Sequence, residues 1–71
     1  MKLTKNQLQF IINNDVEQIV LYLRQDYGYS IIDAFGCIYN SEIYQKLTDT
    51  NTGLYLQSPD YIYDYLKEEI K

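Results

Sequence analysis

A chain of 71 residues has room for one domain, residues 1–71, which buries only roughly 60% of the surface that its unfolded form exposes. A hydrophobic fraction of 46% and a charged fraction of 23% are those of an ordinary globular protein and exclude a disordered chain. The net charge of −4 leaves no surplus of cations to displace counterions from a phosphate backbone, so we expect no nucleic-acid binding.

The N-terminal residues 1–7 contain no apolar segment of the kind that a signal peptide requires, and the longest apolar run covers only residues 19–23. We therefore expect neither secretion nor a membrane span. Cys37 is the single cysteine and cannot form an internal disulfide, which suits a reducing compartment. These features predict a cytoplasmic protein.

The first helix is expected to begin near Thr4, which Leu3 and Leu8 flank as a hydrophobic staple flanks an N-cap. Apolar residues then recur every three or four positions as far as Tyr27, as on the buried face of a helix. The polar residues 13–15 interrupt this pattern and fit either a fresh cap or a polar turn within one long helix. We favour a break at this point and two helices.

Gly28 can end the preceding helix in left-handed geometry, and Ser30 can cap a new helix that starts at Ile31. The spacing predicts that this helix buries one face, formed by Ile31, Ala34, Phe35 and Ile38. Gly36 lowers helix stability by roughly 1 kcal/mol relative to alanine. We expect a close approach by a neighbouring helix to explain that glycine.

The C-terminal half contains two further helix starts, separated by a polar loop. Asn40-Ser41 can cap a short helix, and the turn-forming residues 48–53 then provide the main loop. Residues 54–56 have no strand partner and are expected to lie over the core. Ser58 and Pro59 signal the start of the last helix. The sequence therefore predicts an all-α fold, a small bundle of four to five helices with one ordered loop or extended segment before the last helix.

The chain contains no histidine, which excludes Ser-His-Asp and Cys-His arrangements and most hydrolase templates. Without a histidine partner, Cys37 is expected to be a small core residue and not a nucleophile. The three glycines are isolated and do not form a phosphate-binding loop. We predict a protein that is not an enzyme and that has neither a cofactor nor a small-molecule substrate.

Two groups of acidic residues resemble chemical sites but fit ordinary structure better. The loop at residues 49–53 opens like an EF-hand, but other residues occupy the places of the later oxygen ligand, the glycine and the bidentate glutamate. Asp60, Asp64 and Glu68 fall on one face of the last helix, where a solvated face is the simpler interpretation. No metal site is predicted.

Nine tyrosines are the unusual feature of the composition. On the last helix the apolar residues cover an arc of about 200°, roughly twice what a surface helix needs. Tyrosine is common at protein interfaces because it joins a large apolar ring to a hydroxyl that tolerates a wet rim. We therefore predict a surface for a protein partner or a second copy that involves Tyr22, Tyr61 and Tyr63. Alternatively, a small bundle wraps these residues on both sides, or the segment 54–56 covers them.

Short sequence segments spread over most of the chain are similar to those of small bacterial helical proteins of about this length, which form a domain-of-unknown-function group. The segments are Tyr27-Gly28-Tyr29-Ser30, Tyr39-Asn40-Ser41, Thr52-Gly53-Leu54-Tyr55, Ser58-Pro59-x-Tyr61 and Tyr65-Leu66-Lys67-Glu68-Glu69. Members of that group have been suggested to accompany toxin-like genes, so the resemblance implies an antitoxin or accessory partner. It carries over no functional residue.

The sequence favours a non-enzymatic interaction module that associates with itself or with another protein. The alternative is a regulator linked to nucleic acid, in which residues 31–48 form a compact helix-turn-helix. Acidic residues outnumber the single lysine, Lys46, in this region, where a recognition helix needs cations. The charge therefore argues against the alternative.

Overall fold

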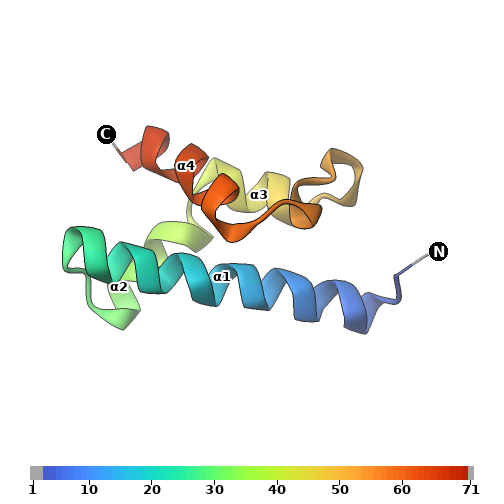
Figure 1. Ribbon diagram of the computed structural model, residues 1–71, viewed down its shortest axis with the longest axis horizontal. Coiled ribbons are helices and arrows are strands. Elements are labelled where there is room, and N and C mark those ends of the chain that lie inside the picture. Colours follow the sequence, from blue (N-terminus) through green and yellow to red (C-terminus); the bar gives the residue numbers. More distant parts are fainter. Residues whose placement is uncertain (1–2, 71) are drawn as a thin grey trace.

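The computed structural model describes residues 3–70, and in this part of the chain it contains helices and turns but no strand (Figure 1). Met1 and Lys2, which belong to the segment tested for a signal peptide, lie outside the described residues. In chain order the elements are α1 (Lys5–Tyr27), α2 (Ile31–Tyr39), α3 (Glu42–Thr48), the short 3₁₀ helices η1 (Thr50–Thr52) and η2 (Leu54–Leu56), and α4 (Pro59–Ile70). The prediction of a small all-α bundle is confirmed.

Helix α1 is continuous over 23 residues, so the predicted break at residues 13–15 is wrong. The helix begins as expected after Thr4, whose hydroxyl accepts a hydrogen bond from the Gln7 amide while the Gln7 side chain accepts one from the Thr4 amide. Asp15 caps no new helix and is buried within α1, with 4% of its surface exposed. One apolar stripe is buried on both sides of the polar residues, and this packing outweighs their preference for a cap.

The helices are arranged around α1, which runs along the longest dimension of a molecule measuring 39 × 20 × 18 Å (Figure 1). Helix α2 turns back beside the C-terminal half of α1, while α4 covers another side of α1 and packs against α3. All four helices contribute to the core, which contains Ile12, Val16, Ile19, Val20, Leu23, Ala34, Ile38, Ile43, Leu47, Ile62, Tyr63 and Leu66. This arrangement leaves the outer sides of α1 and α2 uncovered.

The predicted end of α1 and the predicted starts of the three later helices are confirmed, whereas Thr48, expected in the main loop, is the last residue of α3. Gly28 ends α1 with a positive φ of 70°, and its amide donates a hydrogen bond to the Arg24 carbonyl. Three serine hydroxyls then accept hydrogen bonds from amides of the helices that they cap, in the pairs Ser30 with Asp33, Ser41 with Tyr44 and Ser58 with Tyr61. Local polar signals therefore determine where α2, α3 and α4 begin.

Two expectations for α2 are wrong. Ile31 was expected on the buried face, but it is 51% exposed, and only Ala34 and Ile38 of this helix are fully buried. Apart from the two adjoining residues and the backbone of α2 itself, no atom of the described residues lies within 4 Å of the place that a Cβ on Gly36 would occupy. No close contact with another helix therefore explains this glycine. The Gly36 carbonyl accepts hydrogen bonds from the amide and the side chain of Asn40, which together end the helix.

The segment between α3 and α4 is ordered by its own polar contacts. The Thr52 hydroxyl donates a hydrogen bond to the Lys46 carbonyl at 2.6 Å and accepts one from the Leu54 amide. Leu54 and Tyr55 are half-buried against the core, whereas Leu56 is exposed. The expectation that residues 54–56 lie over the core is therefore confirmed for two of the three.

Candidate protein-interaction surface

Tyr63, one of the three tyrosines predicted to meet a partner, is part of the chain's own core. Tyr63 is only 6% exposed. Its hydroxyl donates a hydrogen bond to the Asp26 carboxylate at 2.7 Å and approaches the Tyr22 carbonyl at 3.4 Å. Burial, with the hydrogen bond to Asp26, raises the pKa of the Tyr63 phenol well above its usual value. Tyr63 therefore joins α4 to α1, and its assignment to an exposed surface is corrected.

Tyr22 lies at the same junction. Its ring is half-buried, with its centroid 5.1 Å from that of Tyr63, and its hydroxyl donates a hydrogen bond to the Asp60 carboxylate. This hydrogen bond raises the pKa of the Tyr22 phenol. Asp60 was expected on a purely solvated face, but it forms part of the contact between α1 and α4. Tyr22 and Tyr63 therefore pack within the fold of the chain itself, between α1 and α4.

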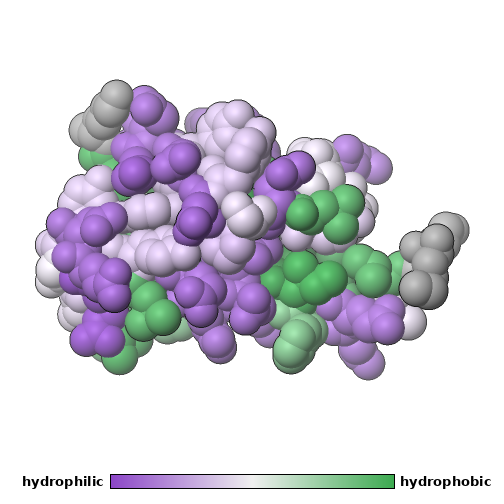
Figure 2. All heavy atoms as spheres, viewed as in Figure 1, coloured by the Kyte–Doolittle hydropathy of each residue, from purple (hydrophilic) through white to green (hydrophobic). Residues whose placement is uncertain are grey.

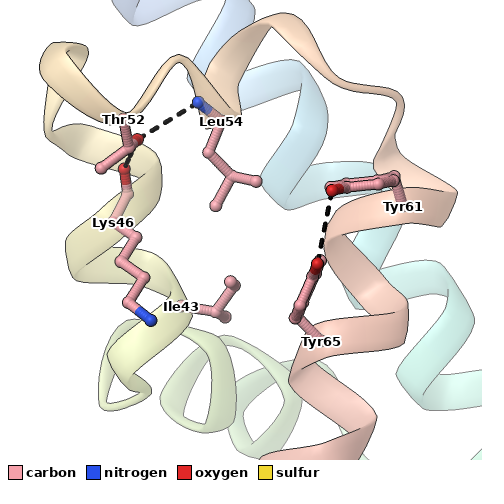
Figure 3. Close-up of a pocket in the computed structure, with 6 residues that line it drawn as sticks. All are labelled: Ile43, Lys46, Thr52, Leu54, Tyr61 and Tyr65. Atoms are coloured by element: carbon pink, nitrogen blue, oxygen red, sulfur yellow. Dashed lines mark hydrogen bonds between the residues drawn. The ribbon is translucent and has the colours of Figure 1, made fainter.

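Of the three tyrosines predicted to meet a partner, only Tyr61 is exposed, at 45%. It lies beside Tyr65, which is 50% exposed, and the two hydroxyl oxygens are 3.3 Å apart. Figure 3 shows both rings on one wall of a shallow hollow, with Lys46 on the opposite side. The hollow measures about 230 Å³ and is completed by Ile43, Thr52 and Leu54. Pockets that hold small ligands usually measure roughly 300 to 1,000 Å³, so this one is small for that purpose.

A larger uncovered surface, which the sequence analysis missed, lies on α2 and the adjoining side of α1. On α2, residues 31, 32, 35 and 39 share an arc of about 100°. Ile32 is 82% exposed, Ile31 51%, Tyr39 49% and the neighbouring Leu21 of α1 48%. We call this surface the α1–α2 apolar face, and it consists of Leu21, Ile31, Ile32, Phe35 and Tyr39. Two adjacent isoleucines in a short helix were the available signal, because both cannot point into the same core.

The α1–α2 apolar face has a defined shape. A hollow of about 260 Å³ between the two helices is lined by Leu21, Ile31 and Phe35, with Glu17 and Arg24 among the polar residues around it. Phe35 stacks on Tyr39 at 5.7 Å, and Tyr39 meets the edge of Tyr44 at 5.0 Å. Figure 2 shows hydrophobic side chains in the region where α1 passes into α2. These mutual ring contacts hold the aromatic side chains in place.

A second apolar region lies at the start of α1. Leu3 is 39% and Phe10 74% exposed, and with Ile11, Asn6 and Gln7 they line an open hollow of about 410 Å³. In Figure 2 hydrophobic side chains also gather over this half of α1. Lys5 is the single charged residue in the first two turns of this helix, so the region lacks the paired charges that border the α1–α2 apolar face.

Cys37 and the loop at residues 49–53 are the features of the sequence that were compared with chemical sites. Cys37 is half-buried, and burial, together with the Glu69 carboxylate nearby, raises the pKa of its thiol. In the loop compared with an EF-hand, the Asp49 carboxylate accepts a hydrogen bond from the Asn51 amide. Residues 3–70 contain no group of three or more cysteine, aspartate or glutamate side chains placed to hold a metal ion.

The N-terminus of α3 already holds a carboxylate. The two oxygens of Glu69, on α4, accept hydrogen bonds from the amides of Glu42 at 2.8 Å and Ile43 at 2.9 Å. A recognition helix presents this end to DNA, where base edges and phosphates lie. An acidic side chain at that position repels phosphate, so this contact disfavours the helix-turn-helix alternative.

Comparisons with protein-family models, with curated proteins and with solved structures found no match. Within residues 3–70, none of the helices combines the length and the apolar character that a bilayer crossing requires. The candidate surface therefore rests on its own geometry.

Proposed function

We propose that this chain is a non-enzymatic, cytoplasmic protein-interaction module whose binding surface is the α1–α2 apolar face. The observation that carries the proposal is the exposure of Ile32, Ile31, Tyr39 and Leu21 on one side of so small a domain. Single exposed apolar residues are ordinary, but a contiguous group of this kind is typical of a surface that meets another protein.

The total surface area supports this proposal. A folded monomer of 8.5 kDa is expected to expose about 4,700 Å², whereas this chain exposes 5067 Å². The molecule is elongated, at 39 × 20 × 18 Å, and large apolar side chains such as Ile32 remain in water. Burying an isoleucine as exposed as Ile32 stabilises a complex by roughly 1.5 to 3 kcal/mol before the costs of association.

The residues of the face also suit binding. Aromatic side chains lose little conformational entropy on binding, and the ring contacts among Phe35, Tyr39 and Tyr44 reduce that loss further. An antitoxin or accessory partner, as the sequence resemblance implies, would be one form of such a module. The Glu69 contact at the start of α3 and the net negative charge both disfavour the nucleic-acid alternative.

Photochemical crosslinking at the face tests the proposal. Benzoylphenylalanine placed at Ile32 should give a covalent protein adduct of defined mass in cells or in concentrated solution. The same group placed at Leu56, which is 69% exposed but lies outside the face, is the matched control and should give none. Leu21→Asp in the chain labelled at position 32 should abolish the adduct. Equal adducts at positions 32 and 56, or none at position 32, would contradict the proposal.

A further inference from the structure

The side of α1 that borders the apolar face carries an ordered pattern of charge. Glu17, Leu21 and Arg24 fall within an arc of about 60° on the helix. Glu17 lies about 6 Å before Leu21 along the helix axis, and Arg24 about 4.5 Å after it. All three residues are exposed and line the same hollow. An apolar centre is thus flanked by one negative and one positive charge.

Neither charge is neutralised within the described chain. Within residues 3–70 the only ion pair joins Lys67 and Asp64, on α4. Glu17 and Arg24 are separated by seven residues, or about 10.5 Å along the axis, and the structure shows no ion pair between them. Their charges therefore remain available to groups outside the chain.

We infer that the occupant of the α1–α2 apolar face is a second copy of this chain, packed with its α1 antiparallel to the first. This inference rests on the proposed function, because it names the partner of the same face. In a two-fold symmetric interface, each residue that contacts a given position is contacted by that position in return. With the axis close to Leu21, Glu17 of each copy faces Arg24 of the other, and two ion pairs form.

The antiparallel direction follows from the charge pattern. A parallel arrangement in register sets Glu17 against Glu17 and Arg24 against Arg24, and both contacts are repulsive. The antiparallel arrangement converts both into attractions and brings the two Leu21 side chains together. Because the border carries one charge of each sign, the net charge of −4 on each copy acts mainly at longer range, where salt screens it.

The area of the face fits a dimer of modest strength. Ile32 and the half-exposed Ile31, Tyr39 and Leu21 together offer on the order of 500 Å² of side-chain surface. A stable specific interface buries about 800 Å² on each partner, so the face supplies more than half of that area before the polar rim is added. We expect reversible dimers that form and dissociate with concentration.

Charge exchange between the two positions tests this inference. Glu17→Arg and Arg24→Glu each place like charges opposite one another twice, so each variant alone should dimerise roughly tenfold more weakly than the natural chain. An equimolar mixture of the two variants should restore association, because every cross-pair is then Arg against Glu. The double variant Glu17→Arg with Arg24→Glu should dimerise about as well as the natural chain. Sedimentation equilibrium gives the dissociation constants.

Several outcomes would overturn the inference. It fails if both single variants dimerise like the natural chain, or if mixing them restores nothing. Loss of folding cannot imitate the expected pattern, because a misfolded variant is not rescued by mixing, and circular dichroism checks each chain. If the natural chain stays monomeric while benzoylphenylalanine at Ile32 crosslinks a different protein, the second copy is excluded and the proposed function stands. If position 32 gives no adduct of any kind, both are wrong.

Discussion

The two sides of helix α1 differ in whether the large side chains beside them are buried or exposed. Toward α4, Tyr22 and Tyr63 place their rings against each other, and their hydroxyls bond to Asp60 and Asp26. Toward α2, the aliphatic Leu21, Ile31 and Ile32 remain in water. Tyrosine can be buried here because its hydroxyl reaches a carboxylate at the rim of the core. Tyr22 and Tyr63 therefore stabilise the fold, whereas the aliphatic residues, with Phe35 and Tyr39, form the apolar face that we propose for a partner.

The largest effect is expected from removing the ring that joins α1 to α4. Tyr63→Ala deletes a buried aromatic side chain and should lower the free energy of unfolding by about 3 to 5 kcal/mol, a large part of the stability of a domain this size. Urea denaturation measures the change. Tyr61→Ala on the same helix removes an exposed ring and serves as the control, with an expected loss below about 1 kcal/mol. Equal losses would show that the two sides of α4 do not differ.

The next effect concerns Asp15, a carboxylate buried in α1 with one oxygen lacking a hydrogen-bond partner. Burial raises the pKa of this carboxyl from 3.8 to about 6, so the folded state holds the proton more tightly than the unfolded state. Stability from this group is full below about pH 4 and is lost as the pH rises through about 6. Asp15→Asn should therefore stabilise the protein by about 1 to 2 kcal/mol at pH 7 and by much less at pH 4.

Thermal unfolding of the Asp15→Asn variant at both pH values checks this prediction. Asn14→Asp, at the neighbouring exposed position, is a control for charge on the same helix and should show no such pH dependence. A gain that is equal at pH 4 and pH 7 would mean that side-chain shape, and not ionisation, explains it.

A smaller effect is expected where Glu69 caps α3. Glu69→Ala leaves the amides of Glu42 and Ile43 without their carboxylate acceptor and should cost about 1 kcal/mol of stability. Glu69→Gln keeps one acceptor oxygen and should recover part of the loss. Urea denaturation of both variants decides the order, and an unchanged midpoint for Glu69→Ala would show that the contact adds nothing to stability.

The smallest effect on stability is expected on the apolar face itself. Ile32→Asp changes a side chain that is 82% exposed and should alter the unfolding free energy of the dilute chain by less than about 0.5 kcal/mol. Comparing the urea midpoints of the variant and the natural chain at low protein concentration measures this difference. A loss of several kcal/mol would place Ile32 in the core and remove the contrast between the two sides of α1.

The sequence was sufficient to predict where the helices start, but it was insufficient to predict which side of each helix is buried. Thr4, Ser30, Ser41 and Ser58 act within one turn of their own position, so local residue types identify them. The burial of Asp15 and the continuity of α1 depend on neighbours far along the chain, and the polar residues 13–15 gave the opposite signal. Tertiary packing outweighed local preference there.

The candidate surface was only partly accessible from the sequence. Tyrosine content indicated a surface for binding, but Tyr22 and Tyr63 face each other across α1 and α4, a contact between residues about forty positions apart that no local pattern reports. Ile31 and Ile32 could have been recognised, because adjacent apolar residues on a short helix point in directions about 100° apart. Only the three-dimensional arrangement brings Leu21 of α1 beside Ile31 and Phe35.

The most direct test of the account is the solution mass by light scattering, measured over a range of concentrations for the natural chain, Ile32→Asp and Leu56→Asp. We predict that the natural chain and Leu56→Asp rise from monomer toward dimer as concentration increases, while Ile32→Asp remains monomeric. Association of all three to the same extent would show that the α1–α2 apolar face does not join the copies.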